Sequence, residues 1–153
     1  MSDNGSRPLI GVTVGDPAGV GPEIVIKALQ DGGVREKVRS VVYADRACLQ
    51  QTVQMLGVEV ELNEVVSPAD GKDEAGVVDF IEVGSLAGPI AYGQISAEGG
   101  QAGYAYLDRA IDAALSGEVV GLATAPLNKE SLQAGKVPFI DHTAVLKSRA
   151  AHR

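Results

Sequence analysis

Residues 15–23, with the sequence GDPAGVGPE, decide how this chain folds. The apolar run before them, residues 9–14, has the composition of a buried strand, and residues 24–29 place their apolar side chains on one helical face. Pro22 suits the first turn of a helix, and the carboxylate of Glu23 is favourable beside the positive end of the helix dipole. The stretch therefore predicts a strand, a glycine-rich loop and a helix start, whose backbone N–H groups could receive an anion.

The spacing of glycines in this loop is not that of a familiar nucleotide motif. It matches neither the dinucleotide pattern G-x-G-x-x-G nor the phosphate-binding pattern G-x-x-x-x-G-K-[ST]. A plain connector between a strand and a helix is therefore an alternative interpretation. Asp16, Gly19 and Gly21 are the residues of this loop that we expect to border a pocket.

The composition is that of an ordinary folded protein. The chain has 153 residues, of which 45% are hydrophobic and 22% charged, enough for one domain with a real core. The formal net charge of -7 argues against a general nucleic-acid surface, because little here would neutralise a phosphate backbone. A local cationic pocket for a small phosphorylated metabolite remains compatible with this charge.

The single cysteine, Cys48, excludes an intramolecular disulfide and is predicted to be a structural helix residue. Residues 1–7 are polar, without an apolar signal core, and are predicted to be a disordered lead-in to a unit over 8–153. No run is long enough to cross a bilayer, so no membrane is expected as a partner. The net charge likewise leaves no nucleic acid as an expected partner. A cytoplasmic protein is the simplest interpretation.

Hydrophobic patterning predicts alternating strands and helices. The expected strands are residues 9–14, 40–44, 58–62, 77–83 and 119–123, the last read as a central strand covered on both faces because it is continuously apolar. The expected helices begin near residues 22, 45, 96, 130 and 144, with Asp45 as an N-cap, Gly117 ending the third, and the fifth running to 153. This order predicts an α/β fold with a mostly parallel sheet and helices on both faces.

The chemistry-bearing residues follow strands, where open α/β sheets bind ligands. Lys129, beside Asn128, is the clearest candidate cation for a phosphate or carboxylate, although a solvated lysine at a helix start is the alternative. His142, followed by Thr143, could donate to a substrate, act as an acid or base, or bind a metal. An ordinary loop histidine is the alternative there.

Several ordered motifs resemble one family. The GDPAGVGPE stretch, Tyr-Gly-Gln-Ile-Ser-Ala-Glu at 92–98, Thr-Ala-Pro-Leu-Asn-Lys at 124–129 and the His-Thr pair at 142–143 are similar to the PdxA family, the 4-hydroxythreonine-4-phosphate dehydrogenases and their relatives. The likeness runs from about residue 9 to about 146. A looser similarity to isocitrate and isopropylmalate dehydrogenases implies that type of fold, here truncated.

The resemblance implies NAD-dependent oxidation, with decarboxylation, of 4-phosphooxy-L-threonine in vitamin B6 biosynthesis, assisted by a divalent metal in a homodimer. It also implies that His142 and Thr143 contact the phosphorylated substrate. A sister-branch dehydrogenase of D-threonate or D-erythronate 4-phosphate, or of another diol acid, is the alternative. A phosphometabolite-binding module without catalysis is the alternative from another class.

Two departures from the family pattern matter. Asp141 and Ala144 flank the His-Thr pair where the family has Gly and Glu, which puts the vitamin B6 substrate in doubt. The family's three metal-binding histidines lie beyond Arg153, so no metal ligand and no certain catalytic residue are expected here. A shifted or shortened reading frame is the expected origin, leaving an inactive N-terminal part with an unpaired sheet edge or exposed apolar surface.

Overall fold

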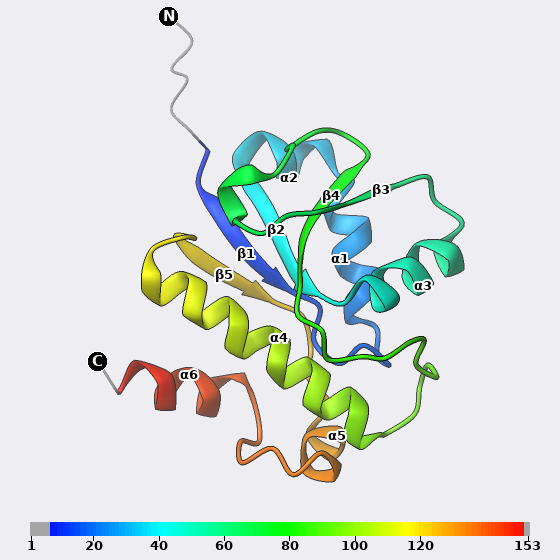
Figure 1. Cartoon of the computed structure of the whole chain (residues 1–153), viewed down its shortest axis with the longest axis vertical. Helices are drawn as coiled ribbons and strands as arrows, with labels where there is room; N and C mark the ends of the chain where they lie inside the picture. Colours follow the sequence, from blue (N-terminus) through cyan, green and yellow to red (C-terminus); the bar gives the residue numbers. More distant parts are fainter. Residues whose placement is uncertain (1–6, 152–153) are drawn as a thin grey trace, which may run out of the picture.

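The computed structural model describes residues 7–151 and is built around one five-stranded sheet (Figure 1). Every neighbouring pair of strands is parallel, and the spatial order is β3-β4-β2-β1-β5. The strands are β1 (Leu9–Thr13), β2 (Arg39–Ala44), β3 (Glu61–Glu64), β4 (Val77–Glu82) and β5 (Gly121–Thr124). The predicted α/β fold with a parallel sheet is confirmed.

Helices cover both faces of this sheet. They are α1 (Gly21–Leu29), α2 (Gly32–Lys37), α3 (Arg46–Leu56), α4 (Ala97–Ser116), α5 (Lys129–Ala134) and α6 (His142–Ala150), with a short 3-10 turn η1 (Pro68–Asp70). Figure 1 shows α4 crossing one face, with α1 and α3 on the other. Among the described residues, no helix is long and apolar enough to cross a membrane.

The two layers of the core follow from strand β2. Its side chains alternate between the faces of the sheet, as the pleat requires. Val41 and Tyr43 pack with Ala110 of α4, whereas Val42 packs with Val25 of α1. The hydrophobic run of β2 is therefore buried on both sides, which is typical of a central parallel strand.

The position of β5 corrects one prediction. The strand was expected to be central and covered on both faces, but it lies at the end of the sheet, and it begins two residues and ends one residue later than predicted. Ala123 and Thr124 are exposed. Although β5 is apolar, as predicted, β1 is the only strand among the described residues that pairs with it. The unpaired edge and exposed apolar surface expected of this chain are both found here.

Smaller differences lie at the ends of elements. The third strand was expected over 58–62 but pairs over Glu61–Glu64, while Val58 and Val60 still pack against the core. Helix α2 was not predicted, because glycines follow Asp31; the Asp31 carboxylate accepts hydrogen bonds from the next turn and starts the helix.

The chain ends also differ from prediction where they are described. Residues 1–6 of the expected lead-in lie outside the described residues, but its last residue, Arg7, forms an ion pair with Asp73. Helix α6 begins at His142, two residues earlier than expected, and ends at Ala150.

Candidate functional site

The loops that follow β1 and β5 meet at the carboxyl ends of these strands. The backbone N–H of Asp16 donates to the carbonyl of Pro126 at 3.0 Å, and that of Ala125 donates to Thr13 at the same distance. Gly15 adopts a φ of +70°, and a Cβ there would lie 2.0 Å from the Pro126 oxygen. Only glycine allows the two loops to approach this closely.

His142 brings a third segment to the same place. It is the first residue of α6 and half-buried, and its Nε2 lies 2.9 Å from the carbonyl oxygen of Ala125. A carbonyl only accepts, so the proton of the imidazole sits on Nε2 in this contact. Hydrogen bonds thus connect the glycine-rich loop and the start of α6 to residues 125–126, just beyond β5.

The side chain of Asp16 lies inside the loop. The residue is 4% exposed, and Oδ1 accepts a 2.8 Å hydrogen bond from the N–H of Ala18. The carboxylate rests against the first turn of α4, where a Cβ on Gly99 would come within 2.8 Å of Oδ1. A negative charge is favourable beside a helix N-terminus. The Asp16 carboxylate is therefore packed between the loop and α4, and this buried position differs from its expected place at the rim of a pocket.

The two predicted loop glycines serve different purposes. Gly21 is buried, and a Cβ there would lie 1.9 Å from the Val14 oxygen, so its role is close packing. Gly19 is exposed and borders an open cavity of about 300 Å³. The cavity is also lined by Thr52 of α3 and by Tyr92, but not by Asn128, Lys129 or His142.

Residues 128 and 129 start helix α5. The Asn128 Oδ1 accepts a 2.9 Å hydrogen bond from the N–H of Ser131, so this side chain is an N-cap. Lys129 is exposed and makes no ion pair with any other residue in the range 7–151. Its ammonium group is consequently available to an anion in solution.

The residues around the His-Thr pair have clear local roles. The Asp141 Oδ1 accepts from the N–H of Ala144 at 2.9 Å and caps α6. The Asp141 carboxylate thus serves the start of α6, which gives this departure from the family pattern a structural role. Thr143, in the first turn of α6, is exposed.

The sequence did not reveal a buried polar cluster around Asp45. This aspartate is the N-cap residue of α3, as predicted, and is 1% exposed, but its side chain makes no hydrogen bond to the first turn of that helix. Its carboxylate instead accepts hydrogen bonds from the N–H groups of residues 84–86 and a 2.7 Å bond from the hydroxyl of Tyr106. Burial raises the pKa of Tyr106, so the phenol stays protonated and donates.

The same cluster connects to the glycine-rich loop. The segment that begins with residues 84–86 continues to Gly93, whose N–H donates to the carbonyl of Ala18 at 2.8 Å. Asp45 therefore anchors a loop that touches the candidate site at its other end. No local pattern signals this arrangement, because its partners are 39 to 61 residues away in sequence.

Cys48 is structural, as predicted. It is 2% exposed, and burial, with the nearby Asp45 carboxylate, raises its pKa to about 12. A thiol with this pKa is fully protonated near neutral pH and is a poor nucleophile. Within the described part of the chain, no three His, Cys, Asp or Glu side chains form a group that could hold a metal ion.

Two curated relatives have sequences similar to that of this chain. A relative from Cupriavidus necator named D-threonate 4-phosphate dehydrogenase is 34% identical over 139 residues, covering 91% of this chain and 42% of its own. A relative from Symbiobacterium thermophilum, named provisionally for the same activity, is 40% identical over 141 residues, covering 92% of this chain and 42% of its own. The chain thus spans about two fifths of the length of these curated relatives.

Solved structures and a family model agree with these relatives. The structure of a 4-hydroxythreonine-4-phosphate dehydrogenase from Burkholderia phymatum superposes with a TM-score of 0.90 at 36% identity, over 95% of this chain and 44% of that one. The family model described as pyridoxal phosphate biosynthetic protein PdxA matches residues 36–153. Because this match takes in well over half of the sequence, the chain belongs to the PdxA family, as its motifs predicted.

Proposed function

We propose that this chain forms the substrate-binding part of a dehydrogenase that oxidises a phosphorylated four-carbon hydroxy acid. The family assignment supports a dehydrogenase, since the named relatives are dehydrogenases of 4-phosphates. The observation that carries the proposal is the meeting of the glycine-rich loop, residues 125–128 and His142 beyond the carboxyl ends of β1 and β5. Ligands of open α/β sheets bind at this end.

Each site residue has a role in the proposal. Lys129, unpaired among the described side chains, supplies the positive charge for the phosphate in a chain that is otherwise acidic. Thr143 offers a hydroxyl donor to the same phosphate. His142 holds the start of α6 against Ala125 and so fixes the position of Thr143.

The names of the curated relatives favour D-threonate 4-phosphate as the substrate. The solved structures carry the name of 4-hydroxythreonine-4-phosphate dehydrogenase, which keeps 4-phosphooxy-L-threonine and vitamin B6 synthesis as the second candidate. Both are four-carbon acids with a terminal phosphate, so the same cation and hydroxyl would serve either.

The cofactors of the proposed reaction are not assigned to residues of this chain. NAD would take the hydride from the substrate carbon, and a divalent metal would polarise its hydroxyl. However, the residues described offer no group of three metal-ligating side chains, and the loop lacks the dinucleotide glycine spacing. The proposed role of this chain is therefore to bind the substrate.

Calorimetric titration with D-threonate 4-phosphate tests the proposal. The wild-type chain should bind this compound and bind D-threonate without its phosphate at least tenfold more weakly. Lys129→Ala should lose at least tenfold in affinity, because the charge that meets the phosphate is removed. Lys37→Ala is the matched control, since Lys37 is also exposed but precedes β2 at the opposite end of the parallel sheet.

Equal losses in the two lysine variants, or equal binding with and without the phosphate, would show that the site is wrongly placed. The same preparation, given NAD, a divalent metal and substrate, should form no NADH, because residues 7–151 contain no group of three side chains that could hold a metal ion. Robust NADH formation by the chain alone would contradict the binding-only role.

A further inference from the structure

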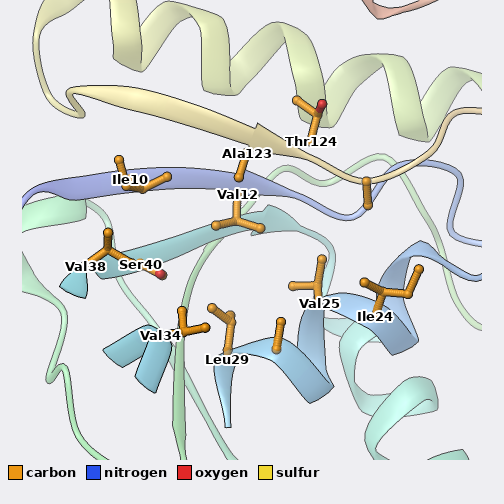
Figure 2. A pocket seen from close by; sticks show the side chains of 12 residues that line it. Ile10, Val12, Ile24, Val25, Leu29, Val34, Val38, Ser40, Ala123 and Thr124 are labelled. Atoms are coloured by element: carbon orange, nitrogen blue, oxygen red, sulfur yellow. The ribbon is translucent and has the colours of Figure 1, made fainter. Parts of the chain in front are cut away.

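An apolar groove lies between helix α1 and the sheet (Figure 2). It has a volume of about 240 Å³, and its walls include Ile24 and Ala28 of α1 and Ala123 of β5. No charged side chain lines it, and its only polar lining residues are Ser40 and Thr124. Figure 2 shows side chains of α1 and of the sheet facing each other across this space.

The groove is open, and it borders an open sheet edge. Ile24 is 47% exposed, and Ala28 and Ala123 are exposed as well. Because Ala123 and Thr124 belong to β5, the last strand of the sheet, the groove and the unpaired edge form one surface. Parallel sheets are normally covered on both faces, and exposed edges invite a further strand. This surface therefore combines exposed apolar side chains with unpaired backbone groups, as a protein core would if part of its covering were absent.

The family comparisons indicate what completes it. This chain keeps the relatives' fold, with a TM-score of 0.90, yet it spans only 44% of the solved chain and 42% of the curated ones. The groove and the edge are thus shared with chains in which more than half of the polypeptide remains to cover them. A second copy of this chain is a poorer occupant, since each copy carries a formal charge of -7 and the groove offers no compensating charge.

We propose that the groove and the free edge of β5 bind the remaining part of a PdxA-family polypeptide when it is supplied as a separate chain. A strand of that part would pair with β5, and an apolar helical face would fill the groove beside Ala28. The interaction needs no substrate, so it stands or fails independently of the proposed function.

Co-expression tests this directly. The probe is the segment of Cupriavidus necator D-threonate 4-phosphate dehydrogenase that follows its matched region, co-expressed with the tagged 153-residue chain. We expect a 1:1 complex by size-exclusion chromatography with light scattering. Ala28→Glu should lower the amount of co-purified segment at least tenfold, because it places a charge in the groove. Met55→Glu is the control, being 49% exposed on α3 and outside the groove.

Two further measurements keep the test decisive. Both variants should melt at the wild-type temperature on their own, since both positions are exposed; Ile24→Glu replaces Ala28→Glu if the latter does not. Hydrogen exchange of the β5 amides should slow in the complex. A segment that stays insoluble or fails to co-purify with the wild-type chain would overturn the proposal. So would equal losses in the groove and control variants, or a homodimer that Ala28→Glu breaks.

Discussion

Two buried tyrosines, Tyr43 of β2 and Tyr106 of α4, differ in what their hydroxyl groups contact. Tyr106 donates to Asp45 at 2.7 Å, whereas the hydroxyl of Tyr43, a residue 1% exposed, has no hydrogen-bond partner in the part of the chain that the structure describes. Burial raises the pKa of Tyr43 to about 12, with Glu118 adding to the shift. A buried hydroxyl without a partner destabilises the folded state, whereas a buried hydroxyl that donates to a carboxylate stabilises it.

The pair gives a matched prediction. Tyr43→Phe should raise the free energy of unfolding by about 1 kcal/mol, because it removes an unsatisfied polar atom and little volume. Tyr106→Phe should lower it by about 1.5 to 3 kcal/mol, because it leaves a buried carboxylate short of a donor. Urea unfolding of both variants measures the difference. Equal effects of the two substitutions would contradict this assignment of partners.

Residue roles that depend on near neighbours could be predicted from the sequence, and those that depend on distant ones could not. Ser96 begins α4 and accepts from the N–H of Gly99, as the helix start at 96 implied. Asp45 is likewise the N-cap residue of α3, but its carboxylate accepts from the distant N–H groups of residues 84–86 and not from the first turn of α3. Nothing in the local pattern distinguishes these two outcomes.

At the scale of elements, α4 and α5 pack through backbone contact at Gly100. A Cβ at this position would lie 1.9 Å from the carbonyl oxygen of Ser131. This explains why a glycine sits inside the longest helix, where it costs up to about 1 kcal/mol relative to alanine. Close packing of α4 against α5 therefore accounts for the glycine at this position.

Gly100→Ala should therefore destabilise the protein despite its better helix propensity. The new methyl group meets backbone atoms that cannot rotate away, so α4 and α5 must separate, at a cost of about 1 to 3 kcal/mol. Gly32→Ala is the control, because Gly32 opens α2 and a methyl group added there would meet no atom within 4 Å; it should be neutral or stabilising by up to about 1 kcal/mol. Unfolding midpoints that fall equally for both would rule out the packing argument.

Across the whole molecule, the element order was predictable and the sheet order was not. Alternating strands and helices implied parallel pairing, but the order of the strands in the sheet, with β5 at the edge, depends on crossovers that no local pattern specifies. Residues 119–123 are as apolar as a central strand, and the same composition produces an exposed Val120 and Ala123 here. The hydrophobic pattern indicates what a strand can bury, and contacts with distant segments decide whether it is buried.

Global stability should also fall at alkaline pH, for a reason that involves both faces of the sheet. Cys48 has its pKa raised from 9.0 to about 12 and Tyr43 from 10.0 to about 12, mainly by burial. The unfolded chain therefore releases these protons first, so their contribution is complete below pH 9 and is lost as pH rises toward 12. Each group acting alone weakens the fold by about 1.4 kcal/mol per pH unit between its two pKa values.

The Cys48→Ala variant distinguishes the contribution of the thiol to this pH dependence from that of the tyrosine hydroxyls. Between pH 8.5 and 9.5 the tyrosines of the unfolded chain, whose ordinary pKa is 10.0, are still largely protonated, so the thiol, whose ordinary pKa is 9.0, dominates the slope of unfolding free energy against pH. The alanine variant should be less stable at pH 7, because a buried side chain has been shortened, yet its stability should change less across this interval. Urea titrations at half-unit steps of pH measure both slopes. Parallel curves for the variant and the wild type would mean that Cys48 ionises as readily in the folded chain as in the unfolded one, and that the core around it admits water.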